Sequence, residues 1–114
     1  MGDEHHEGVC IVTRELDEAC ARAMDWQVQG GDWLHRSGRM LLHVPAYSTD
    51  PATDAEKVAW LTHRGYLQIG VDVNGAAVRL TRDDDRPESM VMATTMTEAL
   101  ARLVVAVAEA EAKR

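Results

Sequence analysis

The run Val44–Pro51 holds the residue types that point most directly to chemistry. Its two hydroxyl residues, Ser48 and Thr49, come just before Asp50 and a proline. A proline in that place is typical of the first position of a helix. The first turn of a helix has N–H groups without intrahelical partners and carries the positive end of the helix dipole. Ser48, Thr49 and the neighbouring N–H groups can therefore hold a phosphate or a carboxylate.

The same residues allow a purely structural interpretation. Ser48, Thr49 or Asp50 can cap the helix and fix the direction in which the chain enters it, which contributes about 1 kcal/mol. Asp50 also repels a bound anion unless its carboxylate turns inward as a cap. From the sequence alone, the capping and the anion-binding interpretations both stay open.

Aromatic and basic side chains elsewhere in the chain suit a nucleotide. Tryptophan rings can stack on a base, although a tryptophan at a helix end usually closes the core, and the chain has three tryptophans, two tyrosines and no phenylalanine. Arginines can balance the charge of a bound anion. The predicted ligand-binding residues are Tyr47, Ser48, Thr49, Asp50, Trp26, Trp33, Arg36, Arg39, His43 and Arg79.

Other chemistries have weaker support in the sequence. The histidines lack the helical or paired-cysteine spacing of a zinc site, and the run Asp83–Asp85 lacks the alternating ligands of a calcium-binding hand. We expect no native metal and no cofactor, and we expect those aspartates to lie in a solvated loop. No nucleophile elbow or glycine-rich phosphate loop is present, so we predict a non-catalytic protein. A phosphodiesterase-like hydrolase using His35 or His43 is the alternative.

Length and charge narrow the class of protein. A chain of 114 residues forms one domain, and a formal charge of -7 argues against a reader of nucleic-acid polymers, which neutralise phosphates with clustered Lys and Arg. A single nucleotide needs only a local positive patch. Two cysteines, Cys10 and Cys20, are too few for a disulfide framework, and no secretory or membrane-spanning run is visible. We expect a cytoplasmic location, a flexible segment over residues 1–12 and one domain over residues 13–114.

Three helices are predicted. Residues 13–25 carry an apolar stripe that includes Leu16, Cys20 and Met24. A second helix begins near residue 50 and ends at 65, burying Ala55, Val58, Ala59 and either Thr62 or Leu61. The third opens with a capping box at Thr95 and Glu98 and runs to about residue 112, with Leu100, Leu103, Val104 and Val107 facing the core.

The strands lie between these helices. Gly30 and Gly31 end the first helix, and residues 33–44 form a short hairpin around Ser37-Gly38 with Leu34, Leu41 and Leu42 available to the core. Asn74-Gly75 predicts a type I′ turn, which sets Val73 opposite Ala76, Val71 opposite Val78 and Ile69 opposite Leu80. Residues 90–93 form a third strand. The expected fold is α+β: an antiparallel sheet of about three to five strands packed with three helices, as in an α-β-α sandwich.

Several short motifs, taken in their order along the chain, resemble the phage α-β-α sandwich domain family of small phage and prophage proteins. They are Ala23-Met24-Asp25-Trp26, Trp33, the run Pro45-Ala46-Tyr47-Ser48-Thr49-Asp50, Arg64-Gly65-Tyr66 and Thr97-Glu98-Ala99-Leu100. The resemblance covers roughly residues 16–112, and its most specific part is Tyr47 to Asp50. Because most members of the family have no assigned biochemistry, it implies a phage accessory protein rather than an activity.

Two functions are therefore expected. The first is counter-defence: the protein binds and sequesters a small nucleotide signal of bacterial immunity. The alternative is an inhibitor or modulator of a host protein that acts through an acidic surface including Asp83–Asp85. In either case a homo-oligomer is expected, because Val105 and Trp60 lie away from their helices' core stripes and leave apolar surface.

Overall fold

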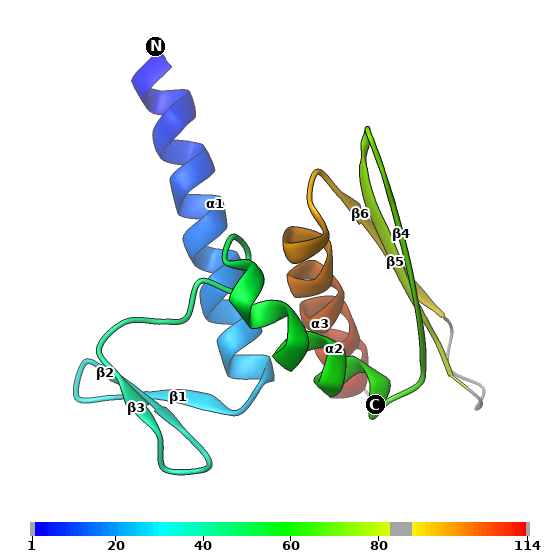
Figure 1. Ribbon diagram of the computed structural model, residues 1–114. Helices are drawn as coiled ribbons and strands as arrows, with labels where there is room; N and C mark the ends of the chain where they lie inside the picture. Colours follow the sequence, from blue (N-terminus) through cyan, green and yellow to red (C-terminus); the bar gives the residue numbers. More distant parts are fainter. Residues whose placement is uncertain (1, 83–87, 114) are drawn as a thin grey trace.

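The described residues fold into three α-helices and two three-stranded antiparallel sheets, which confirms the α+β class. The computed structural model describes residues 2–82 and 88–113, and of residues 2–12 it describes the backbone alone. The sequence predicted one sheet, but the strands divide between two, with the helices lying between them (Figure 1). The helices are α1 (Gly2–Ala23), α2 (Asp54–Thr62) and α3 (Met96–Ala112). The N-terminal sheet comprises β1 (Trp26–Gln29), β2 (Asp32–His35) and β3 (Met40–Leu41), and the C-terminal sheet comprises β4 (Tyr66–Asp72), β5 (Gly75–Thr81) and β6 (Ser89–Ala93).

Helix α3 is the centre of the core. It packs against β5, β6, α1 and α2. The predicted core residues of this helix are all fully buried: Leu100, Leu103, Val104 and Val107. The predicted capping box is present in part, because Thr95 Oγ1 accepts a hydrogen bond from the Glu98 N–H at 3.1 Å. The Glu98 carboxylate turns instead to Arg102, at 2.8 Å.

Helix α1 is longer than predicted. It begins at Gly2 instead of near residue 13, and its N-terminal half extends beyond the other elements (Figure 1). The predicted stripe residues Cys20 and Met24 are buried. The helix ends at Ala23, and Asp25, two residues later, has a left-handed φ of 72° that turns the chain into β1. The flexibility of residues 1–12 stays a prediction.

The N-terminal sheet contains a hairpin that the sequence analysis missed. Gly30 and Gly31 have φ values of 62° and 89° and join β1 to β2 through a two-residue loop, as a type I′ turn requires. They therefore start a hairpin as well as ending the helical region. The predicted hairpin around Ser37-Gly38 joins β2 to β3. The core role predicted for Leu41 and Leu42 is wrong, because these side chains are 37% and 74% exposed, and Leu34 is only half-buried.

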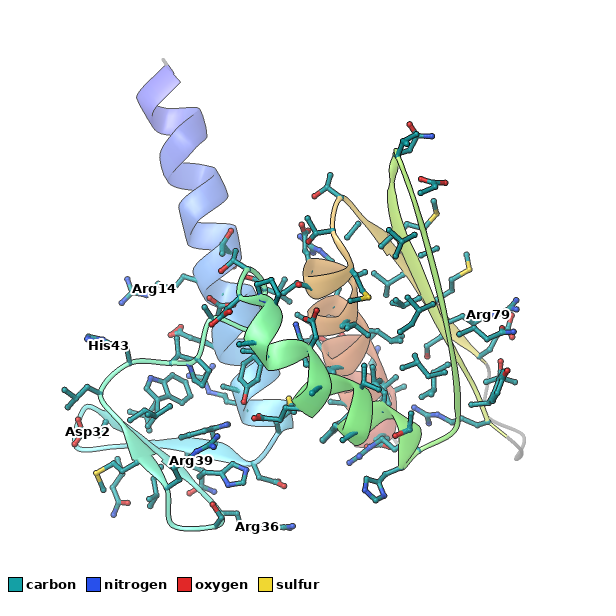
Figure 2. All side chains as sticks on the ribbon, viewed as in Figure 1. Arg14, Asp32, Arg36, Arg39, His43 and Arg79 are labelled. Carbon is teal, nitrogen blue, oxygen red and sulfur yellow. The ribbon has the colours of Figure 1, made fainter. Side chains whose placement is uncertain are left out.

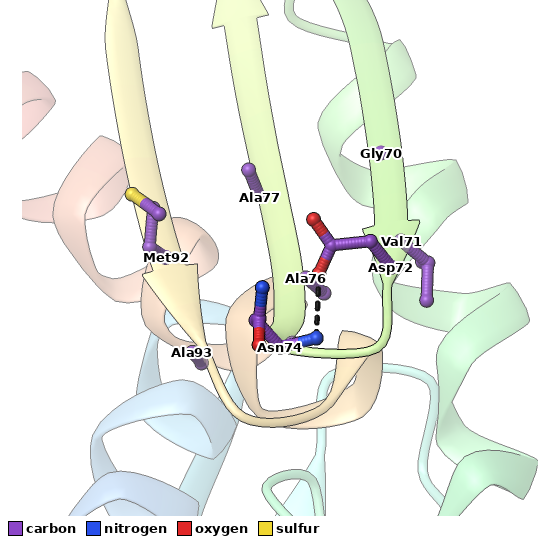
Figure 3. Close-up of a pocket in the computed structure, with 9 residues that line it drawn as sticks. Gly70, Val71, Asp72, Asn74, Ala76, Ala77, Met92 and Ala93 are labelled. Atoms are coloured by element: carbon purple, nitrogen blue, oxygen red, sulfur yellow. Dashed lines mark hydrogen bonds between the residues drawn. The ribbon is translucent and has the colours of Figure 1, made fainter.

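The C-terminal hairpin has the predicted faces but a different register. Ile69 lies opposite Val78 and Val71 opposite Ala76, so each partner is two residues away from the predicted one. The loop is Val73-Asn74, because the Asp72 carboxylate accepts a hydrogen bond from the Asn74 N–H at 2.7 Å (Figure 3) and forms a side-chain turn. A shift of two residues keeps every side chain on its face.

Helix α2 presents a different face from the one predicted. It is preceded by a short 3-10 turn, η1 (Pro51–Thr53), and the α-helix begins only at Asp54. Ala55, Ala59 and Thr62 are exposed, Val58 is half-buried, and the buried residues are Lys57 and Leu61. The three-residue period of the 3-10 turn changes the phase of the helix that follows.

The prediction that Val105 and Trp60 form an exposed apolar surface for self-association is wrong. Val105 and Trp60 are half-buried and pack against the core. The exposed apolar side chains lie on the sheets and their loops instead: Val28, Met40, Leu41, Leu42, Tyr66, Ile69, Val71, Val73, Met90 and Met92.

Candidate functional site

A chain of hydrogen bonds joins the N-terminal sheet to α2 through the loop before η1. Trp26 Nε1 donates to Tyr47 Oη at 2.9 Å, and Tyr47 Oη donates to Glu56 Oε2 at 2.5 Å. Trp26 and Tyr47 are each 1% exposed. Burial first, and then the hydrogen bond to Glu56, raises the pKa of Tyr47, so its hydroxyl stays protonated and donates. The result is a rigid support that ends in the Glu56 carboxylate.

Two nitrogen-bearing side chains lie beside this support. The Arg39 guanidinium carbon is 5.0 Å from the centroid of the Trp26 ring, and Arg39 Nη2 is 3.7 Å from Glu56 Oε1. The register of β1 and β2 sets Trp26 opposite His35, whose ring centroid is 5.0 Å from that of the indole. More than half of the Arg39 side chain is exposed. Arg39 can therefore offer its remaining donors to a ligand.

A hollow of about 340 Å³ opens beside these residues. That volume is within the range of small-molecule sites, about 300 to 1,000 Å³. Its lining includes the cation Arg39, the carboxylates of Asp25 and Glu56, and the apolar surface of Trp60. The residues that line it are Met24, Asp25, His35, Ser37, Arg39, Glu56 and Trp60.

The loop that joins β2 to β3 orients His35. His35 Nδ1 lies 2.9 Å from Ser37 Oγ and accepts a hydrogen bond from the Ser37 N–H at 3.1 Å. With Nδ1 acting as an acceptor, the proton of the neutral ring is on Nε2. Neutral His35 is therefore a hydrogen-bond donor at Nε2.

The predicted anion cradle at the helix start is filled by the chain's own groups. Asp17 Oδ1 accepts from the Ser48 N–H at 2.7 Å, and Asp50 Oδ1 accepts from the Ala52 N–H at 3.0 Å. The N–H groups of Thr49 and Asp50 donate to the Ala46 carbonyl. These bonds favour the capping interpretation over anion binding at this position.

The remaining predicted residues lie apart from one another. Trp33 is 7% exposed and is covered by Arg22, whose guanidinium carbon is 5.5 Å from the ring centroid. Arg36 lies near the hollow, 3.8 Å from the Asp25 carboxylate. His43 is exposed and is not among the residues that line the hollow.

Arg79 belongs to the other sheet. It donates to Gln68 Oε1 and lies 3.9 Å from Glu88. In Figure 2 the helices separate it from Arg39. Of the predicted residues, the structure therefore brings together Tyr47, Trp26 and Arg39, with Arg36 beside them.

Sequence reasoning missed Glu56, the role of His35, and Lys57. Lys57 is fully buried, and its Nζ donates to the Tyr47 carbonyl at 2.5 Å and to the Thr97 carbonyl at 2.8 Å. Its charge is balanced by Asp54, 3.1 Å away. Burial lowers the pKa of Lys57, an effect that Asp54 opposes. The available signal was spacing, because Lys57 is four residues before the buried Leu61 and shares its helix face.

Comparisons of the chain with protein families, with curated proteins and with solved structures found no match. The resemblance to the phage α-β-α sandwich family therefore stays a prediction. Within residues 2–82 and 88–113, no helix combines the length and apolar character needed to cross a bilayer.

Proposed function

We propose that this chain is a non-catalytic protein that binds a small nucleotide in the hollow beside Trp26. One observation carries the proposal: an exposed arginine and two carboxylates border a ligand-sized hollow, and the hydrogen bonds from Trp26 to Tyr47 and from Tyr47 to Glu56 hold one of these carboxylates in place. The planar fork of Arg39 suits a phosphate. Glu56 and Asp25 can accept hydrogen bonds from the amino and imino groups of a base. Trp60 adds apolar surface to the hollow, and the Arg64 guanidinium carbon lies 3.5 Å from the centroid of its ring.

The protonation of the site supports binding over turnover. The raised pKa of Tyr47 keeps its hydroxyl from acting as a nucleophile. Neutral His35 has its lone pair on Nδ1 beside Ser37, so Nε2 donates a hydrogen bond rather than accepting a proton from water. We therefore favour retention of an intact ligand over the phosphodiesterase-like alternative.

The resemblance to a phage family suggests a biological role for this binding. We propose that the ligand is a nucleotide signal of bacterial immunity and that the protein sequesters it in the cytoplasm of the host. A protein that binds its signal without degrading it must be present in amounts similar to those of the signal. A short chain can be synthesised in such amounts.

Titration calorimetry with cyclic dinucleotides and with nucleotides derived from ADP-ribose tests the proposal. We expect one of them to bind wild-type protein, and Arg39→Gln to weaken that binding about tenfold or more, because a charge-assisted contact contributes about 1.5 to 3 kcal/mol. Arg14→Gln is the matched control, since Arg14 is an exposed arginine on α1 that does not line the hollow and lies apart from Arg39 (Figure 2). No binding by any of these nucleotides, or equal affinity of the Arg39→Gln variant, would contradict the proposal.

A second candidate function is binding of a host protein. The outer face of the C-terminal sheet presents Tyr66, Met90 and Met92, which are 68%, 61% and 72% exposed, and a hollow of about 420 Å³ lies beside Met92 (Figure 3). Exposed methionines suit adaptable protein-binding surfaces. The predicted acidic loop Asp83–Asp85 lies outside the described residues. A pull-down from host lysate should recover a specific protein with wild type and lose it with Met90→Lys; recovery of nothing specific argues against this candidate.

A further inference from the structure

The free edge of β4 is unusually well suited to pairing. Among the described strands, β4 pairs only with β5, so its other edge has no strand beside it. The strand is seven residues long, Tyr66–Asp72, and contains no proline and no lysine. Exposed edges are normally protected by charges, prolines or bulges, because every second residue directs its N–H and C=O groups outward. The only charge on β4 is Asp72, at its end.

The core-facing side of β4 is apolar and lacks a cover. Ile69 and Val71 lie opposite the buried Val78 and Ala76 of β5, which places them on the face that looks toward the helices. They are nevertheless 42% and 65% exposed. Helix α3 packs on β5 and β6, and α2 reaches β4 near its beginning. The apolar layer of the core therefore continues along β4 into solvent.

We propose that two copies of this chain associate through β4, antiparallel and edge to edge, to form one continuous six-stranded sheet. A two-fold axis at Ile69, the middle of the strand, sets Ile69 opposite its own copy and Leu67 opposite the second copy's Val71. A two-fold axis perpendicular to a sheet keeps equivalent faces on the same side. Ile69 and Val71 of both copies thus meet in one apolar strip flanked by the two α3 helices.

The other face of the strand is compatible with the same register. Gln68 lies opposite the second copy's Gly70, and Tyr66 lies opposite its Asp72. No two carboxylates face each other, and each Asp72 carboxylate is already bonded to the Asn74 N–H of its own loop. For a chain with a formal charge of -7, association is least opposed where the surface carries least charge, and the single charge of β4 lies at its end, at Asp72. The self-complementary sequence of β4, with uncharged residues from Tyr66 to Val71, identifies a second copy as the occupant.

This dimer does not depend on the proposed nucleotide site, which lies beside the N-terminal sheet. Light scattering after gel filtration, over a series of protein concentrations, should give twice the mass of the chain for wild type. Ile69→Lys and Ile69→Asp should each give a single chain, because each places like charges opposite one another. An equal mixture of the two variants should restore the double mass, and native mass spectrometry should identify it as one Lys chain with one Asp chain.

Met92→Lys is the matched control, since Met92 is equally apolar and more exposed but lies on β6. It should remain a dimer, and circular dichroism should show that all variants are folded. A monomeric wild type, a dimer that persists in Ile69→Lys, or equal loss of the dimer in Met92→Lys would overturn the proposal.

A cysteine variant keeps the test decisive if the charged variants do not fold. In a Cys10→Ser background, Ile69→Cys should form a disulfide-linked dimer on oxidation. Directly opposed residues of an antiparallel pair are about 4.5 to 5.5 Å apart at Cα, within the span of a disulfide. The native Cys20 is buried and does not compete. A folded Ile69→Cys protein that stays unlinked after oxidation overturns the proposal.

Discussion

Lys57 is the buried charge on which the middle of the molecule depends. Its ammonium group holds the carbonyl of Tyr47, in the loop before η1, and that of Thr97, in the first turn of α3. Asp54 supplies the opposite charge and also accepts a hydrogen bond from Thr97 Oγ1 at 3.1 Å. Three segments therefore meet at one nitrogen atom, and the loop that carries Tyr47 is fixed by it.

Replacing Lys57 with methionine should destabilise the protein strongly. The substitution keeps most of the volume but leaves two carbonyls and Asp54 without their partner, so we expect the free energy of unfolding to fall by about 3 kcal/mol. Urea unfolding measures it. Lys113→Met, on an exposed lysine, should change it by less than about 0.5 kcal/mol. Equal urea midpoints for Lys57→Met and wild type would contradict the role given to Lys57.

Cys20 makes stability depend on pH. Burial raises the pKa of Cys20 to about 12, whereas a thiol in an unfolded chain ionises near pH 8.5. The contribution of the thiol is therefore complete below about pH 8.5 and is lost as the pH rises toward 12, because only the unfolded chain ionises in that window. Urea unfolding at pH 8 and at pH 10 measures the effect. Between these two pH values, the free energy of unfolding should fall by about 1 to 2 kcal/mol less for Cys20→Ala than for wild type. Equal losses would show that the thiol ionises in the folded protein.

The two glycine dipeptides show what local sequence can predict about elements. Gly30-Gly31 adopts the left-handed conformations of a type I′ turn, so the signal for this hairpin was present in the sequence. Asn74-Gly75 has the stronger turn signal, yet the Asp72 side chain captures the Asn74 N–H and moves the loop by one residue. Competition between a side chain and the backbone for one N–H group is not visible in dipeptide preferences.

Gly75 should tolerate no side chain. Its φ is 142°, and a Cβ there would lie 2.4 Å from the Ala93 carbonyl oxygen of β6. We expect Gly75→Ala to reduce the free energy of unfolding by about 1 to 3 kcal/mol, measured by urea unfolding. Gly70→Ala is the control, because nothing lies within 4 Å of a Cβ at that position. Similar effects of the two substitutions would argue against this hairpin geometry.

How well the buried face of a helix could be predicted depended on the size of the residues in its apolar stripe. The stripe of α3 is made of large aliphatic residues and has one possible inner face, which is the observed one. The candidate stripe of α2 is made of Ala55, Val58 and Ala59, and small residues discriminate weakly between faces. The phase of α2 was decided by η1 and by the buried contacts of Lys57, which depend on tertiary structure.

On the scale of the whole molecule, the candidate site could be predicted only in part. Tyr47, Trp26 and Arg39 were identified by residue type, but they come together through contacts between distant segments, in which Trp26 bonds to Tyr47 and both Tyr47 and Arg39 reach Glu56 of α2. Trp26 and Trp33 are too buried to stack on a base, in line with the expectation that a tryptophan at a helix end closes the core. Glu56 acquires its role from Tyr47, nine residues away, and Arg39, on a separate hairpin.

The most direct test of the central claim is native mass spectrometry of the untagged protein mixed with the nucleotide panel. We predict that each chain retains one nucleotide and that the added mass equals that of the intact molecule. The Arg39→Gln variant should remain unloaded under the same conditions. A wild-type protein that stays bare with every nucleotide, or one that releases a cleaved product, would contradict the account.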